Sequence, residues 1–146
     1  MKFRRPLCLA VVVTASGALF SACSDDANVV ADDGIPVIEV TMVDLAFSPS
    51  SVEIAAGETV RFRFNNTGVA IHDAVIGDLE VQEHHASGMA EGTAEHGGED
   101  EPTTVVVAPG ETGEILYTSG APGTLIIGCH QPGHWDAGMK AALTIT

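Results

Sequence analysis

One stretch of twelve residues, Gly128–Met139, constrains the fold of this chain more than any other. It reads GCHQPGHWDAGM and spaces Cys129, His134 and Met139 five residues apart. The strand-like sequences GTLIIG before it and KAALTIT after it predict a loop that joins two strands. A thiolate and imidazoles bind copper strongly, and a thioether is the weak axial ligand of a trigonal site with two histidines and one cysteine. Such a site needs a second histidine, and His72, at the end of an earlier strand-like segment, is the candidate.

From Pro36 onward the chain reads as short strands separated by turns. Apolar and polar residues alternate in segments such as 38–42 and 60–64, which is typical of strands with one buried face. Turn signals recur at intervals of about eight to twelve residues, without a helical period. These patterns predict an all-β, single-domain β-sandwich.

Further segments match one known family. In the loop and in the motifs FSP (47–49), AGETVRF (56–62) and NNTG (65–68), the chain resembles the cupredoxins, the small blue-copper proteins. The resemblance covers residues 36–146 apart from an insertion near 78–103. It implies a Greek-key, cupredoxin-like β-sandwich.

The resemblance also implies a cofactor and its ligands. One type 1 copper ion would be bound by His72, Cys129, His134 and Met139. Many cupredoxins carry Asn directly after the first histidine, whereas this chain has Asp73. The departure bears on the hydrogen bonding around the cysteine sulfur, and therefore on the reduction potential.

The function that the resemblance implies is electron transfer, without enzymatic activity. Copper would cycle between Cu(I) and Cu(II) within one rigid ligand set, and His134 matches the ligand through which family members pass electrons. Trp135, Pro132 and Ala137 are candidates for an apolar patch around it, and Trp135 is equally a candidate for a cover over the metal. We expect a redox partner with a basic or an apolar docking face.

The insertion near 78–103 motivates an alternative function: a copper scavenger or donor at the cell surface, without a dedicated redox partner. Its Gly-, Glu- and Ala-rich composition predicts a mobile loop with one helical turn near Leu79–His84. No fixed ligand spacing emerges, which favours a solvated segment that binds nothing. The side chains that would bind copper on the alternative reading are His84, His85, Met89 and His96.

Other metal and cysteine chemistries fit the loop less well. Structural zinc sites use closed sets of Cys and His ligands without a thioether. A binuclear copper centre needs a second cysteine where Gly133 stands, and a nucleophilic Cys–His enzyme leaves Met139 unexplained. The trinuclear cluster of multicopper oxidases takes more histidines than the six in this chain and needs His-x-His pairs, which are absent. His130 is therefore expected to be a solvent-edge residue.

The first 22 residues have the pattern of an export signal, with a basic start and an apolar core too short to span a bilayer comfortably. The Ser-Ala-Cys sequence that ends at Cys23 resembles a bacterial lipobox, although Phe20 stands where Leu is usual. We expect a lipid on Cys23, a flexible acidic tether over 23–35, and anchoring at the outer face of the cell membrane. Ordinary cleavage with Cys23 as a spare thiol is the alternative.

Charge narrows the range of partners. Removing residues 1–22 takes three of the six Lys and Arg and none of the 20 Asp and Glu, which leaves a net charge of −17. Such a chain repels nucleic acid and anionic lipid headgroups, so we expect no nucleic-acid partner and a lipid rather than charge as the membrane anchor. We expect a monomer.

Overall fold

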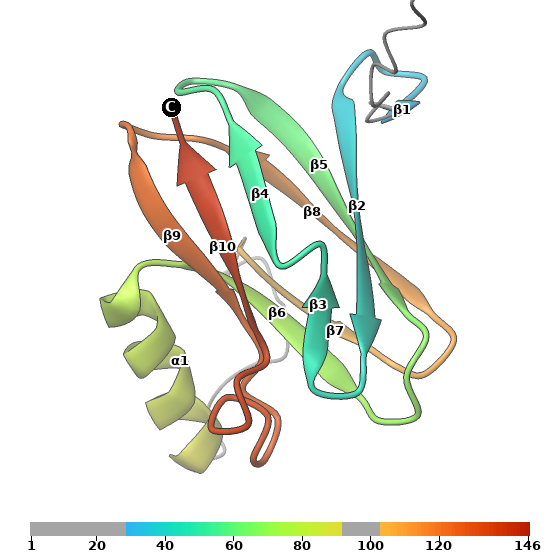
Figure 1. Ribbon diagram of the computed structural model, residues 1–146, viewed down its shortest axis with the longest axis vertical. Helices are drawn as coiled ribbons and strands as arrows, with labels where there is room; N and C mark the ends of the chain where they lie inside the picture. Colours follow the sequence, from blue (N-terminus) through green and yellow to red (C-terminus); the bar gives the residue numbers. More distant parts are fainter. Residues whose placement is uncertain (1–28, 92–102) are drawn as a thin grey trace, which may run out of the picture.

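The computed structural model describes residues 29–91 and 103–146 (Figure 1). They form a β-sandwich of two sheets with one helix, which confirms the predicted fold class of a single all-β domain. The export signal, Cys23 and His96 lie outside the described residues.

The first sheet has the order β1-β2-β5-β8, with β3 also paired to β2. β2 and β5 run parallel, and the other pairs are antiparallel. Its strands are β1 (Val29–Val30), β2 (Pro36–Val43), β3 (Ala46–Ser48), β5 (Thr59–Asn66) and β8 (Thr112–Thr118).

The second sheet has the order β4-β10-β9-β6-β7. The loop that carries Cys129, His134 and Met139 joins β9 to its antiparallel neighbour β10. His72 is the first residue of β6, and not the last residue of a strand as expected. The strands are β4 (Ser51–Ile54), β6 (His72–Gly77), β7 (Thr104–Val107), β9 (Gly123–Gly128) and β10 (Lys140–Ile145).

The core lies between the two sheets, where the alternating apolar residues meet. Phe62 and Phe64 of β5 are fully buried and stack with ring centroids 6.0 Å apart. Phe47 of β3 meets Phe64 edge to face at 6.4 Å, and Leu143 of β10 is buried from the other sheet. Burying side chains of this size stabilises the fold by about 1.5–3 kcal/mol each.

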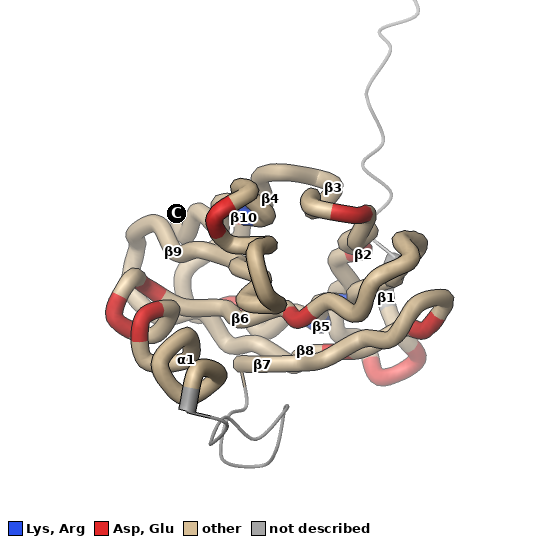
Figure 2. The backbone as a smooth tube through the Cα atoms, turned by 90° about the horizontal axis from the view of Figure 1, so that it is seen from below, with Lys and Arg blue, Asp and Glu red and all other residues tan. Residues whose placement is uncertain are grey.

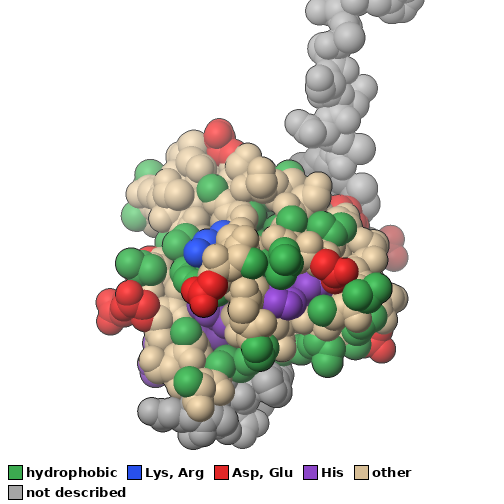
Figure 3. All heavy atoms as spheres, turned by 60° about the horizontal axis from the view of Figure 1, so that its bottom comes forward, with side chains coloured by type: hydrophobic (Ala, Val, Ile, Leu, Met, Phe, Trp, Pro, Cys, Tyr) green, Lys and Arg blue, Asp and Glu red, His purple; other side chains and the backbone are tan. Residues whose placement is uncertain are grey.

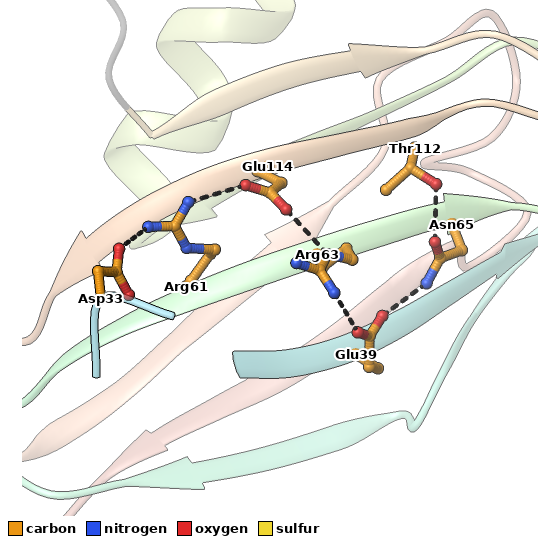
Figure 4. Close-up of polar contacts among 7 residues, drawn as sticks. All are labelled: Asp33, Glu39, Arg61, Arg63, Asn65, Thr112 and Glu114. Carbon is orange, nitrogen blue, oxygen red and sulfur yellow. Dashed lines mark hydrogen bonds and ion pairs between the residues drawn. The ribbon is translucent and has the colours of Figure 1, made fainter. Parts of the chain in front are cut away.

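The intervening residues of β5 point outward, as their alternation predicts, and carry a ladder of ion pairs (Figure 4). Arg63 pairs with Glu39 at 3.0 Å and with Glu114 at 2.8 Å. Arg61 pairs with Glu114 and with Asp33, which precedes β2. Together these contacts hold the outer face of β2, β5 and β8.

The expected tether over 23–35 is too long. Residues Val29 and Val30 pair with Val37 and Pro36 as strand β1, and the Asp33–Arg61 ion pair fixes the turn that follows. The folded domain therefore begins at Val29 among the described residues. A strand of two residues shows no periodicity in the sequence, so the pairing of Val29–Val30 could not be predicted.

The helical turn expected near Leu79–His84 is present but longer, because residues Leu79–Glu91 form a helix, α1, that packs on β6 and β9 (Figure 1). The mobile loop expected after that turn is therefore wrong up to residue 91. Asp78 begins it, since its carboxylate accepts the Val81 N–H at 3.0 Å, as an N-cap residue does. The helix covers the face of β6 that points away from the core. It thereby buries Asp73, whose neighbours His72 and Ala74 point inward.

Acidic residues lie on loops on several sides of the domain, with few basic ones among them (Figure 2). None of the described helices is long and apolar enough to cross a membrane.

Candidate metal centre

Three of the four predicted ligands meet at one end of the sandwich. The Sγ atom of Cys129 lies 3.3 Å from Nδ1 of His134 and 3.9 Å from Nδ1 of His72, and the two Nδ1 atoms are 3.2 Å apart. All three donor atoms lie within 4.8 Å of one another. Cys129 and His72 are buried and His134 is half-buried.

The spacing of these donors fits a single metal ion. An ion at about 2.0–2.3 Å from two nitrogens and one sulfur in a trigonal plane separates the donors by about 3.5–3.8 Å. The observed separations of 3.2, 3.3 and 3.9 Å lie close to these values. One soft sulfur and two imidazoles favour copper over magnesium or calcium, which take oxygen ligands. The donor set therefore fits copper.

Backbone hydrogen bonds fold the ligand loop so that Met139 returns to Cys129. The Met139 N–H donates to the His134 carbonyl at 3.0 Å, and the Met139 carbonyl accepts the Cys129 N–H at 3.2 Å. Gly133 and Gly138 take positive φ angles of 83° and 94°, which other residues adopt at a cost. The Met139 side chain is fully buried. Its role as the axial ligand stays a prediction.

His72 is positioned by the segment that precedes it. Asn66, at the end of β5, is buried and donates to the carbonyls of Ala70 at 2.8 Å and Val107 at 2.9 Å, while its own side-chain oxygen accepts the Gly68 N–H at 3.0 Å. These bonds close the turn over 67–71 against β7. The predicted NNTG motif thus sets the position from which β6 begins.

Burial controls the protonation of two ligands. Burial, followed by the negative charge of Asp73, raises the pKa of the Cys129 thiol to about 12. Burial and the neighbouring His134 lower the pKa of His72, despite the opposing charge of Asp44. In the metal-free protein at neutral pH, Cys129 therefore holds its proton and His72 is neutral. A metal ion that binds here must displace the thiol proton.

Asp73 lies directly behind the cysteine and is fully buried. Its Oδ1 accepts the His130 N–H at 2.6 Å, and its Oδ2 lies 3.5 Å from Nε2 of His85 on α1. Burial raises the pKa of this carboxyl, but the neighbouring His85 imidazole and Cys129 thiol, together with the hydrogen bond from the His130 N–H, outweigh it and lower the pKa overall. Asp73 is therefore ionised at neutral pH.

His130 is half-buried rather than at the solvent edge. Its Nε2 lies 2.8 Å from Oε1 of Gln82, and its ring stacks on Trp135 with centroids 4.5 Å apart. Lys140 lies over the Trp135 ring, with Nζ 3.9 Å from the ring centroid. Trp135 thus packs on His130, and its place in the apolar patch around His134 or over the metal stays a prediction.

Sequence reasoning missed Gln82 and His85 as supports of the site. Gln82 is fully buried and donates to the carbonyls of Val75 at 2.9 Å and Ile126 at 3.1 Å, and so links α1 to both β6 and β9. Gly128 leaves room for it, since a Cβ there would lie 2.5 Å from the Gln82 side chain. The Asp78 N-cap was the one available signal for the helix that carries both residues.

A second carboxylate lies behind His72. Asp44, in the turn between β2 and β3, has Oδ1 3.6 Å from Nε2 of His72, the nitrogen opposite the one that faces Cys129. The same oxygen accepts the N–H groups of Val69 at 3.0 Å and Ala70 at 3.3 Å. Gly68 packs over this contact, because a Cβ there would lie 2.5 Å from the carboxylate.

The surface at this end is partly apolar. Histidine side chains reach it among hydrophobic ones (Figure 3). The exposed hydrophobic residues beside Asp44 and His72 are Leu45, Val69 and Ile71, with 47%, 84% and 51% of their surface accessible. We call these three residues the apolar rim.

Comparisons with known proteins agree with this geometry. Residues 36–146 match the sequence model of the copper binding proteins of the plastocyanin/azurin family. The copper-resistant cuproprotein CopI of Pseudomonas aeruginosa is 33% identical over 74% of this chain and 75% of its own length. Auracyanin-B of Chloroflexus aurantiacus is 30% identical over 82% of this chain, which spans 56% of that relative. A solved auracyanin from Roseiflexus castenholzii shares the fold with a TM-score of 0.66 at 24% identity, over 75% of this chain and 96% of the other.

Proposed function

The chain belongs to the plastocyanin/azurin family of copper-binding proteins, and from this premise we propose that it carries single electrons at a mononuclear type 1 copper centre. The observation that carries the proposal is the cluster of His72, Cys129 and His134, with two donors buried and the third half-buried. Donors held in place by β6 and by the β9–β10 loop need little rearrangement when the ion changes its oxidation state. We propose no enzymatic activity.

Copper supplies the one-electron chemistry in this proposal. Cys129 would provide the thiolate once its proton has left, His72 and His134 would provide imidazole nitrogens, and Met139 would provide a weakly bound thioether. The apolar core residues beside Met139 and Cys129 keep water away from the sulfur. His134 is the half-buried ligand, so we assign it as the route between the centre and the surface.

The redox partner is proposed to dock on the apolar rim. Exposed apolar residues that lie together commonly mark contact surfaces, and Leu45, Val69 and Ile71 lie beside the turn that holds His72. The acidic charge of the chain favours a partner with a basic border around an apolar centre.

We further propose that the chain is exported and held at the outer face of the membrane by a lipid on Cys23. The support is the sequence of residues 1–23 alone. Radiolabelled palmitate should enter the wild-type protein in a bacterial host and should not enter Cys23→Ala. Equal labelling of both proteins, or release of the wild type as a free protein, would contradict the lipid anchor.

A second candidate function is copper resistance, in which the same centre holds copper rather than passing electrons. Two relatives named for copper resistance support it: CopI of Pseudomonas aeruginosa and CopI of Rubrivivax gelatinosus, the latter 34% identical over 74% of this chain and 65% of its own length. Exchange kinetics separate the two functions. An electron carrier keeps its ion in both oxidation states, whereas a donor releases Cu(I) to an acceptor chelator.

The primary test is the visible spectrum of the copper-loaded domain. Adding Cu(II) should produce an intense thiolate-to-copper charge-transfer band, and Cys129→Ser should abolish it. His130→Ala is the matched control, because His130 is adjacent in sequence but does not join the ligand cluster. A colourless product that binds zinc tightly would contradict the proposed centre.

A further inference from the structure

Two carboxylates stand behind two different ligands of the proposed centre. Asp73 lies behind Cys129 on the side that α1 covers, and Asp44 lies behind His72 on the side of the β2–β3 turn. Asp73 stands where many cupredoxins carry Asn. Two histidines, one cysteine and one methionine can bind copper without a carboxylate nearby, so the negative charges of Asp73 and Asp44 need a separate explanation.

The Asp73 charge is only partly compensated by its surroundings. It accepts one short hydrogen bond, from the His130 N–H at 2.6 Å, while Oδ2 lies 3.5 Å from His85 and has no shorter partner among the described residues. Lys140 is held over the Trp135 ring rather than against the carboxylate. Copper loading would remove the Cys129 thiol proton, one of the groups that lower the pKa of this carboxyl. A buried anion then faces the metal-bound sulfur.

The Asp44 carboxylate lies on the far side of the His72 imidazole from the proposed metal position. Nδ1 of His72 faces Cys129, and Nε2 lies 3.6 Å from Asp44, beyond hydrogen-bond distance, so the carboxylate acts on the ring through its charge. The carboxylate is oriented by the N–H groups of Val69 and Ala70, so it does not depend on the ring for its position. Its side chain is 49% exposed, and solvent therefore screens its charge more than that of Asp73.

We propose that Asp73 and Asp44 are positioning residues whose negative charges stabilise Cu(II) relative to Cu(I) and so lower the reduction potential of the centre. The inference rests on the proposed type 1 site. A negative charge near the ion favours the state with the larger positive charge, and it does so more strongly where water is excluded. Such a centre suits a protein that holds the oxidised ion or donates electrons readily.

Redox titration of copper-loaded variants tests the inference. Asp73→Asn keeps the shape of the side chain and should shift the affinity ratio toward Cu(I) about tenfold, which is about 59 mV for one electron. Asp44→Asn should shift it in the same direction by about threefold, because its charge is screened. The double variant should change the affinity ratio by about the product of the two single fold-changes, because the two carboxylates act on different ligands. Asp136→Asn, an exposed carboxylate in the ligand loop, is the matched control and should leave the potential unchanged.

Equal potentials for Asp73→Asn, Asp44→Asn and the control, or a fall in potential, would overturn the inference. If Asp73→Asn fails to fold, the presence or absence of the predicted threefold shift in Asp44→Asn tests the inference. The Asp44 side chain is half exposed, so its replacement should leave the fold intact. The metal-free protein provides a further readout: the ultraviolet titration of the Cys129 thiolate should show a lower pKa in Asp73→Asn. A wild type without a charge-transfer band would instead contradict the proposed function, and the thiol titration would still report the effect of Asp73.

Discussion

At Cys129, burial and the charge of Asp73 together raise the pKa of the thiol to about 12. The metal-free thiol is therefore protonated throughout the neutral range, and copper must displace that proton. The apparent copper affinity should rise about tenfold per pH unit between about pH 7.5 and 9, because one proton competes with the ion. His72 adds no second proton there, since its pKa is lowered. Chelator competition over this range measures the slope, and a flat profile would contradict a thiol ligand.

Met139 has a different role if it is the axial ligand, because a thioether carries no charge and binds weakly. Met139→Leu should keep the copper and its colour and shift the affinity ratio toward Cu(I) by up to about tenfold, about 59 mV for one electron. Met139→Gln should shift it the other way, because an amide oxygen is a harder donor. Voltammetry on both variants measures the effect. Loss of copper from Met139→Leu, or no change in its potential, would remove Met139 from the proposed centre.

The cluster of candidate ligands could be predicted from sequence, because few other sites combine a thiol, an imidazole and a thioether at regular spacing. Cys129, His134 and His72 do meet. The partners of Asp73 could not be predicted. His85 lies in a helix that follows β6, and only the packing of α1 on the sheet brings it to the carboxylate.

At the scale of elements, the packing of α1 on the sheet relies on the buried side-chain amide of Gln82 and not on an apolar helix face. Gln82→Ala should lower the free energy of unfolding by about 1–3 kcal/mol, because the carbonyls of Val75 and Ile126 would lose a donor in a place that water does not reach. Glu83→Ala, the exposed neighbour on the same helix, is the control and should change stability little. Urea denaturation compares the two. Equal stabilities would show that Gln82 does not join the helix to the sheet.

The helix α1 is also the part of the fold that could not be predicted from the sequence. Strands of this chain show their buried faces as alternating apolar residues, as in β5, so their existence and order along the chain were predictable. The buried face of α1 carries Gln82 and His85, which look like surface residues in a sequence. A helix whose inner side is polar shows no hydrophobic period, and Asp78 alone was too weak a signal to predict thirteen residues of helix.

At the scale of the whole molecule, the excess of acidic residues should govern the rate of encounter. The full chain carries a net charge of −14, and its acidic residues lie on several sides (Figure 2). Oxidation of the reduced protein by a cationic metal complex should be faster than by an anionic complex of similar potential, by about tenfold or more at low salt. Added salt should bring the two rates together, because it screens the charges. Stopped-flow mixing measures both rates, and rates that do not change with salt concentration would contradict electrostatic steering.

The pairing of β1 with β2 also limits where the metal-binding end can travel. β2 runs from its contact with β1 toward the turn that holds Asp44, so its eight residues, about 26 Å long, separate Val29 from the ligands. If Cys23 carries a lipid, the six peptide units from Cys23 to Val29 reach at most about 20 Å. The ligand end would then stay within about 46 Å of the bilayer surface, the sum of the two lengths. A partner held within that layer would meet it at a high effective concentration.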